Sequence, residues 1–191
     1  MEHRMNHDDL EQAIHTLLQA IGENPHRPGL RRTPTRVAQM FTEILDGYDL
    51  DAAELTAESL FDVAYDEMIL VKDIQFFSMC EHHLLPFFGR AHVAYVPQDK
   101  IIGLSKIPRT VDMFAHRLQV QERMTQQIAY ALADVLSPQG LGVIVEGTHL
   151  CAMMRGVKKE QARLVTSVML GSFKSNPATR QEFLDLLKLP Q

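Results

Sequence analysis

The sequence is poor in cysteine, with two among its 191 residues. Two cysteines in a chain of this length do not form the disulfide framework that holds small secreted domains together. A single Cys80–Cys151 disulfide is an alternative, which a reducing compartment disfavours. Thiolates are also soft metal ligands, so both cysteines are candidates for a metal site.

Long apolar runs and an excess of positive charge are also missing. No stretch approaches the 18 or so apolar residues of a membrane-spanning helix, and Met1-Glu2-His3-Arg4 lacks a signal-peptide pattern. We therefore expect a soluble, cytoplasmic protein without a membrane partner. The formal net charge of −5 argues against a general nucleic-acid binder. A hydrophobic content of 46% is enough for a sizeable core.

The first 66 residues read as an N-terminal helical appendage and connector. Apolar residues at helical spacing start at Leu10 and stop at Gly22, a typical C-terminal breaker. Thr33-Pro34 supplies an N-cap and a first-turn proline for a second helix that ends at Gly47. Residues 48–66 are acidic and weakly periodic, which predicts a connector.

Residues 67–191 are predicted to form the catalytic domain. Strand-like runs and amphipathic helices follow in the order β-β-α-α-β-β, before a last helix that Asn176-Pro177 caps. This order is typical of the α+β class with an antiparallel sheet. The expected strands cover 69–77, 87–96, 140–151 and 164–173, and the expected helices cover 106–116 and 120–136.

The richest chemistry lies in two short segments, Cys80-Glu81-His82-His83 and His149-Leu150-Cys151. A Cys-x-x-His pair closes around one metal ion, and Cys151 can add a third ligand while leaving one tetrahedral position open. Zinc with an open position activates water, which indicates hydrolytic chemistry. If residues 149–151 are a strand, the side chain of His149 lies beside Cys151 on one face. His82 and His149 are then candidate proton carriers, because imidazole titrates near neutral pH.

Two alternatives stay open from the spacing alone. Cys80, His83, His149 and Cys151 can also make a closed, structural Cys₂His₂ zinc site. The chain would then be a nucleotide-binding regulatory module rather than an enzyme. A zinc nucleoside deaminase is disfavoured because the sequence has no Cys-x-x-Cys pair.

Basic residues follow the expected strand ends and point to a phosphorylated substrate, because guanidinium and ammonium groups grip phosphate oxygens. The alternative is that these basic side chains form a charged surface exposed to solvent and bind no substrate. Glu122, beside Gln121, lies at the start of a predicted helix, where a carboxylate usually complements the helix dipole. It can equally accept two donors from a guanine edge. The basic residues concerned are Lys106, Arg109, Arg155, Lys158 and Lys159.

Four ordered motifs together resemble the GTP cyclohydrolase I family. They are Ser78-Met-Cys-Glu-His-His-Leu-Leu-Pro-Phe-Phe-Gly89, Ile102-Gly-Leu-Ser-Lys-Ile-Pro-Arg109, Gln119-Val-Gln-Glu-Arg123 and His149-Leu-Cys-Ala-Met-Met-Arg-Gly156. The resemblance runs from about Thr33 to Leu187. It implies the tunnelling fold, in which antiparallel sheets of several subunits close into a barrel. It also implies a homodecamer with active sites between subunits, and the conversion of GTP and water to 7,8-dihydroneopterin triphosphate and formate.

The resemblance also implies roles for individual residues. Cys80, His83 and Cys151 resemble the zinc ligands, and His82 and His149 resemble the histidines that assist water attack and protonate the purine ring. Glu122 resembles the guanine anchor, with Gln121 beside it. Ser105 resembles a residue near the ribose. The triphosphate contacts are implied for Lys106, Arg109 and Arg155, with Arg36 of a neighbouring subunit as a further one.

One segment departs from the family pattern. The family often carries Ser-x-Thr where this chain has Ala162-Arg163-Leu164. Hydroxyl contacts from these positions, including any at a subunit contact, are therefore in doubt. A different tunnelling-fold enzyme, acting on a related pterin or deazapurine, is the second enzymatic alternative. The combination of Cys80, His83, Cys151 and Glu122 favours the GTP enzyme.

Overall fold

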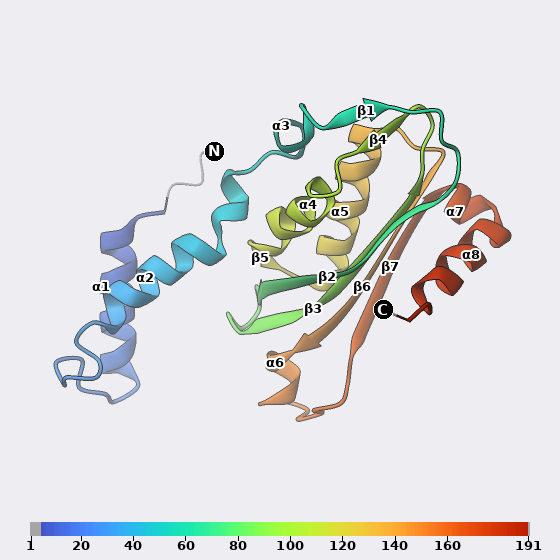
Figure 1. The fold of residues 1–191 in the computed structure, drawn as a ribbon. Helices are drawn as coiled ribbons and strands as arrows, with labels where there is room; N and C mark the ends of the chain where they lie inside the picture. The colour runs from blue at the N-terminus through green and yellow to red at the C-terminus, as the bar shows by residue number, and fades with distance from the viewer. Residues whose placement is uncertain (1–4, 191) are drawn as a thin grey trace.

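The N-terminal part of the chain is a pair of helices that lies to one side of the molecule (Figure 1). The computed structural model describes residues 5–190. Helix α1 covers His7–Ala20 and helix α2 covers Thr33–Ile44, and the two pack against each other. The Asn6 side chain caps α1 by accepting hydrogen bonds from two backbone N–H groups, and Pro34 occupies the first turn of α2. Both helices were predicted from their periodicity.

The segment after α2 contains more structure than a connector. It forms a 3₁₀ helix, η1 (Asp46–Asp49), then helix α3 (Ala52–Thr56) and strand β1 (Leu60–Asp62). Strand β1 pairs antiparallel with β4 (Lys100–Ile102), and α3 packs against the two helices on the main sheet. The domain boundary at residue 66 stays a prediction.

A five-stranded sheet forms the body of the molecule, in the order β5-β2-β3-β6-β7. Its strands pair antiparallel except for β5, which is parallel to β2 at Met79 and Cys80. The four predicted strands are antiparallel, as expected, and the two-residue β5, which was not predicted, makes the sheet mixed. The strands are β2 (Ile69–Cys80), β3 (Pro86–Val96), β5 (Leu118–Gln119), β6 (Gly140–His149) and β7 (Leu164–Gly171).

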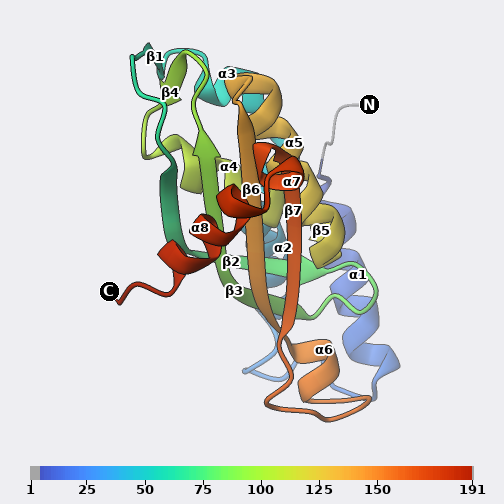
Figure 2. The same ribbon diagram turned by 90° about the vertical axis from the view of Figure 1, so that its right-hand side faces the viewer.

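Helices cover the two faces of this sheet unequally. Helices α4 (Lys106–Ala115) and α5 (Gln121–Leu136) bury their apolar faces against one side, where Phe76, Phe87 and Val93 form the core with them. Helices α7 (Ser172–Ser175) and α8 (Pro177–Leu187) pack on the opposite side (Figure 2). As predicted, Asn176 caps the last helix.

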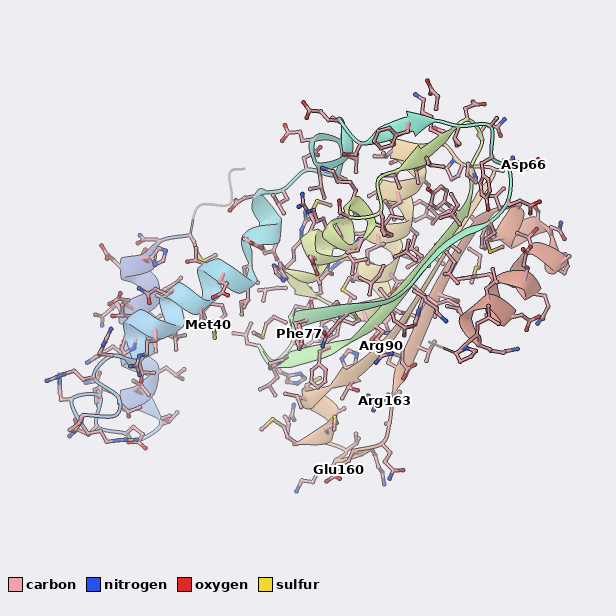
Figure 3. The ribbon with its side chains drawn as sticks, in the orientation of Figure 1. Met40, Asp66, Phe77, Arg90, Glu160 and Arg163 are labelled. Carbon is pink, nitrogen blue, oxygen red and sulfur yellow. The ribbon has the colours of Figure 1, made fainter. Side chains whose placement is uncertain are left out.

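The face away from α4 and α5 is partly open and carries charge. Phe88, Arg90 and His92 alternate with core residues of β3, so their side chains lie on this face. They line a hollow of about 820 Å³ together with residues of β6 and β7, including Glu146, and with Arg163 just before β7. Arg90 and Arg163 are labelled in Figure 3. None of the residues lining it was predicted as a site residue.

The end of β6 corrects a sequence-based prediction. The strand stops at His149, and the chain turns at once into the short helix α6 (Leu150–Met153). Cys151 therefore sits on a helical turn and not on the strand that the sequence predicts. Within residues 5–190 no helix is both long enough and apolar enough to span a membrane.

Candidate metal centre

The loop between β2 and β3 brings His83 back towards Cys80, the last residue of β2. The Cys80 carbonyl accepts hydrogen bonds from the N–H groups of His83 (3.4 Å) and Leu84 (2.9 Å), and the Cys80 N–H donates to the Leu85 carbonyl (2.9 Å). Leu84 adopts a left-handed conformation with φ of 50°. This conformation is uncommon for a residue with a side chain. The tight turn thus holds a thiol and an imidazole on one side of the loop.

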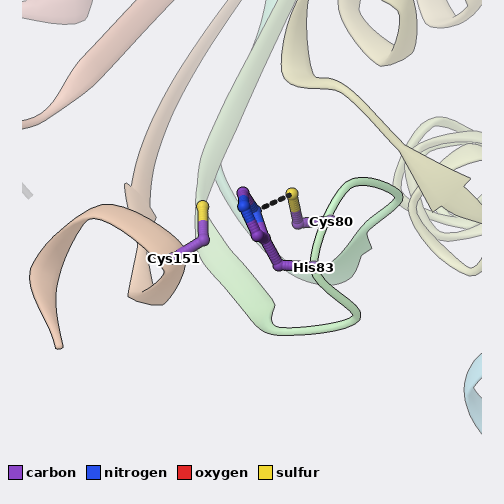
Figure 4. A group of neighbouring side chains, drawn as sticks. All are labelled: Cys80, His83 and Cys151. Carbon is purple, nitrogen blue, oxygen red and sulfur yellow. Dashed lines mark hydrogen bonds between the residues drawn. The ribbon is translucent and has the colours of Figure 1, made fainter. Parts of the chain in front are cut away.

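Cys151 approaches the same point from α6 (Figure 4). The ligand atoms of Cys80, His83 and Cys151 all lie within 4.8 Å of one another, and the Cys80 Sγ is 4.0 Å from the His83 Nδ1. Cys80 is buried, Cys151 is half-buried and His83 is exposed. Both cysteines are free, so the alternative disulfide is not formed. Two segments that are distant in sequence, the β2–β3 loop and α6, therefore converge on one metal-sized site.

The donor set and spacing fit a single metal ion. Thiolate and imidazole ligands of a tetrahedral ion are about 3.5–3.8 Å apart, given metal–ligand bonds of about 2.0–2.3 Å. In the part of the chain that the structure describes, no fourth histidine, cysteine or carboxylate joins the group. His149, the fourth member of the predicted closed site, is directed to a different partner. The protein thus offers three ligands.

The hydrogen-bond partner of His149 is Gln121, the first residue of α5. The His149 Nε2 lies 2.9 Å from the Gln121 Oε1, and the imidazole ring stacks on Phe87 with a centroid distance of 4.6 Å and an interplanar angle of 4°. Burial lowers the pKa of His149, and the nearby Glu122 carboxylate partly opposes this change. Burial therefore favours the neutral imidazole.

The second predicted proton carrier, His82, has different surroundings. Its side chain is exposed and its Nε2 lies 3.9 Å from a carboxylate oxygen of Glu81. Its ring meets that of His83 edge-on, with centroids 6.2 Å apart. His82 is thus beside the metal ligands but open to a molecule that approaches from outside.

An ion pair between Glu81 and Arg123 ties this loop to the first turn of α5, and the sequence analysis missed it. Arg123 also donates to the Leu118 carbonyl (3.1 Å) and to the Gln119 Oε1 (3.1 Å). The Glu81 N–H donates to the Gln119 carbonyl (3.1 Å). The hydrogen bond with Arg123 lowers the pKa of Glu81. Glu81 lies between predicted site residues, but nothing in the sequence pairs it with Arg123.

A comparison with known protein families identifies the family of this chain. The family model described as GTP cyclohydrolase I matches residues 10–188, nearly the whole chain. The chain belongs to the GTP cyclohydrolase I family. The resemblance read from the four motifs is therefore confirmed.

Curated relatives carry the same family name. A protein called GTP cyclohydrolase 1 from Gloeobacter violaceus is 53% identical over 180 residues, which cover 94% of this chain and 84% of the relative. A protein of the same name from Leptospira biflexa is 53% identical over 179 residues, which cover 94% of this chain and 98% of the relative. A solved structure of the archaeosine synthase QueF-Like in the apo form is similar at a TM-score of 0.46 and 13% identity, over 55% of this chain and 93% of that chain. That similarity is too low to assign the fold.

Of the remaining predicted site residues, Glu122 and Arg155 lie near the metal-binding group, and Gln121 faces the interior. Glu122 is exposed on the first turn of α5, close enough to His149 to affect its pKa. Arg155 follows α6, and its charge lowers the pKa of Cys151, although burial and the Cys80 thiol raise that pKa more strongly. Gln121 is 1% exposed, so its side chain faces the protein interior.

The triphosphate and ribose candidates on α4 lie at the opposite end of that helix from the metal ligands. The Ala115 carbonyl at the C-terminus of α4 accepts a hydrogen bond from Ser78 near the end of β2. Ser105, Lys106 and Arg109 are at the other end, and a ten-residue helix is about 15 Å long. Arg36 is on α2, in the N-terminal helix pair.

The segment Ala162-Arg163-Leu164, which departs from the family pattern, contacts Gln121 through its backbone. The Leu164 carbonyl accepts a hydrogen bond from the Gln121 side chain (3.0 Å), whatever the side chain at this position. Arg163 donates to the Thr148 hydroxyl and lies 3.7 Å from a Glu146 carboxylate oxygen. The hydrogen bond from Gln121 to Leu164 therefore does not depend on the side chain at position 164.

Proposed function

We propose that this chain is a zinc-dependent GTP cyclohydrolase I. It opens the imidazole ring of GTP with water and rearranges the product to 7,8-dihydroneopterin triphosphate, with release of formate. This is the first step of pterin and tetrahydrofolate biosynthesis. The observation that carries the proposal is the three-ligand group of Cys80, His83 and Cys151 with His149 turned aside to Gln121. The match of the family model to residues 10–188 supports it.

The donor set favours zinc over the hard cations, because thiolate and imidazole are ligands that zinc prefers. When bound there, zinc supplies Lewis acidity that brings the pKa of a water molecule to about 7. Ca²⁺ and Mg²⁺ take oxygen ligands, which this group does not offer.

His82 and His149 move the protons of the reaction. Addition of water to C8 of the purine requires that a proton leaves the water, and cleavage of the C8–N bond requires that one reaches the ring nitrogen. A second hydrolysis releases C8 as formate. The ribose then opens and rearranges, and the new ring closes with loss of one water. The two imidazoles flank the metal ligands from the hairpin loop and from β6.

The substrate is bound by groups from more than one subunit. Glu122 accepts the guanine edge and Arg155 binds a phosphate near Cys151. Ser105, Lys106 and Arg109, at the far end of α4, serve a site of the neighbouring chain, with Arg36 as an additional phosphate contact. The separation of about 15 Å along α4 supports this arrangement.

A homodecamer with the tunnelling fold accounts for the edges of the sheet. Along β2, the structure shows pairing with β5 only at Met79 and Cys80, and the outer edge of β7 has no partner strand within residues 5–190. Exposed edges of this length are normally paired or protected. Strands of neighbouring subunits fill both edges in a closed barrel. The division into a helical appendage (1–66) and a catalytic domain (67–191), and the cytoplasmic location, rest on the sequence pattern.

Incubation of the purified protein with GTP tests the activity directly. Formate and the fluorescent oxidised neopterin should both appear, in equal amounts, and both should disappear after zinc is removed with a chelator. A protein that binds GTP and holds a fourth side-chain ligand on its zinc, without product, would instead be the regulatory module.

Replacing Cys151 by Ser tests the metal site. Removal of one of three ligands should lower zinc affinity and turnover together, as measured by metal content after dialysis and by neopterin fluorescence. Full zinc occupancy in this variant would remove Cys151 from the ligand set.

A further inference from the structure

The Gln121 side chain is committed to groups inside the protein. Its Nε2 lies 3.0 Å from each of three acceptors, the carbonyls of Val145 and Leu164 and the hydroxyl of Thr166. Backbone carbonyls only accept hydrogen bonds, so this end of the amide must be the NH₂ group. The other end, Oε1, is therefore the atom that faces the Nε2 of His149 at 2.9 Å.

This orientation fixes the tautomer of His149. An amide oxygen only accepts hydrogen bonds, so the His149 Nε2 must carry a proton and donate it. In the neutral imidazole the Nδ1 is then the unprotonated nitrogen. Within residues 5–190 the Nδ1 has no hydrogen-bond partner. It is the nitrogen left to exchange a proton with a bound molecule.

The surrounding structure is shaped for this contact. A Cβ at Gly147 would lie 2.2 Å from the Gln121 Oε1 and 3.4 Å from the His149 Nε2, so only glycine leaves room for the amide. Phe87 stacks on the imidazole and prevents the ring from turning away. Thr125 bonds both to the Gln121 carbonyl and to the Thr166 hydroxyl, which completes the buried network.

We propose that Gln121 is a positioning residue that holds His149 in its Nε2–H tautomer, and that its side chain does not contact the substrate. The inference rests on the proposed function, since His149 is its proton carrier. It replaces the substrate contact that the sequence suggested for Gln121. The role reaches the reaction only through His149, so loss of Gln121 affects proton transfer rather than GTP binding.

The test is a double-mutant cycle with Gln121→Met and His149→Ala, in which kcat and KM for GTP are measured separately. Gln121→Met should lower kcat about 10- to 100-fold, as expected for a misplaced proton carrier, with KM changed less than about threefold. In the His149→Ala background, Gln121→Met should lower kcat further by less than about twofold. Slow rates are measured with enzyme in excess over GTP.

Thr125→Val is the matched structural control. It removes a hydroxyl from the same buried network without touching His149. It should lower the melting temperature and leave kcat within about twofold of wild type. An equal loss of kcat in Thr125→Val, a raised KM with unchanged kcat in Gln121→Met, or additive effects in the cycle would each overturn the proposal.

Gly147→Ala is the second test variant, to be used if the Gln121→Met protein does not fold. The added methyl group displaces the amide oxygen but keeps the Gln121 side chain, so kcat should fall again while KM stays unchanged. A raised KM with normal kcat would count against the proposal. Absence of product from the wild-type protein would refute the proposed function itself, which is a separate outcome.

Discussion

The two histidines beside the metal ligands differ in what holds them. His149 is half-buried, stacked on Phe87 and bonded to Gln121, so its position is set before any ligand arrives. His82 is exposed on the hairpin loop and has a carboxylate of Glu81 at 3.9 Å. A fixed and an exposed imidazole suit different proton transfers, one to a buried ring atom and one shared with solvent.

Replacing His82 by Ala should therefore leave the metal bound but cut turnover by about 10²-fold or more, because a proton-transfer group is lost. Zinc content and neopterin formation are measured on the same preparation. Unchanged turnover would show that His82 is not a proton carrier, and loss of zinc would place it in the ligand set.

His92 provides a prediction on pH and stability. Its Nδ1 accepts a hydrogen bond from the Asp73 N–H (3.0 Å), and burial lowers its pKa below 6.5, although the Asp73 and Glu146 carboxylates oppose this. The unfolded chain then binds the proton more readily, so the stabilisation is complete above pH 6.5 and is lost as pH falls towards the folded-state pKa.

His92→Gln keeps an acceptor for the Asp73 N–H but does not titrate. The fall in unfolding free energy between about pH 7.5 and 5.5 should be smaller in this variant than in wild type, as measured by denaturant unfolding. His26→Gln, at an exposed position of the N-terminal region, is the control. Equal pH slopes for wild type and His92→Gln would contradict the prediction.

At the scale of elements, the hairpin loop between β2 and β3 is attached to α5 through one arginine. Arg123 contacts Glu81, Leu118 and Gln119, so the loop, β5 and the first turn of α5 share a single side chain. The loop carries Cys80 and His83, and the helix turn carries Glu122. The attachment therefore sets the metal ligands relative to the proposed guanine anchor.

Arg123→Met should loosen this loop and lower zinc affinity about 10-fold, the usual effect of removing a residue that orients metal ligands. Chelator competition measures the affinity. Arg27→Met is the control, since Arg27 also pairs with a glutamate, Glu23, but far along the chain from the metal-binding loop. Equal zinc affinity in the Arg123→Met and wild-type proteins would show that Arg123 does not orient the metal-binding loop.

Most elements could be predicted from the sequence because their signals are local. Helices α1, α2 and α5 show apolar periodicity, and Asn176 caps α8 as predicted. The predicted N-cap at Thr33 is wrong, because Thr33 is the first residue of α2 and no side chain caps this helix. Strand β5 has only two residues, too few for a pattern. Nothing in the sequence of β6 indicates that the chain turns into a helix after His149.

The site could be predicted in its residue types but not in its pairings. The spacing of Cys80, His83 and Cys151 indicates a metal site, because ligand types and short loops are visible in sequence. The Glu81–Arg123 and Gln121–His149 contacts join residues 42 and 28 positions apart. Such contacts depend on how β2, β6 and α5 pack, which local patterns do not encode.

At the scale of the whole molecule, we propose that each chain contributes one half to each of two sites. The metal ligands and Glu122 lie near one end of α4, and Lys106 and Arg109 lie at the other end. A homo-oligomer brings unlike halves together, because a rotation that closes a ring repeats the same contact at every interface.

Mixed oligomers test this arrangement. A chain with His149→Ala and a chain with Lys106→Ala and Arg109→Ala should each be nearly inactive alone. Co-expressed, they should regain activity at about a quarter of the sites if the subunits mix at random, because one interface type then has both halves intact. No recovery in oligomers shown to contain both chains would place all these residues in one subunit's site.

In the proposed assembly, the length of α4 also determines how one defective subunit affects its neighbours. A subunit that folds well but carries one faulty side chain at each end of this helix spoils its own centre and the adjacent one. Such a subunit is dominant negative. In a cell that makes equal amounts of defective and intact chains, enzymatic activity should fall well below one half. A variant chain that is too unstable to join the oligomer should reduce activity less, because the intact chains would assemble with one another.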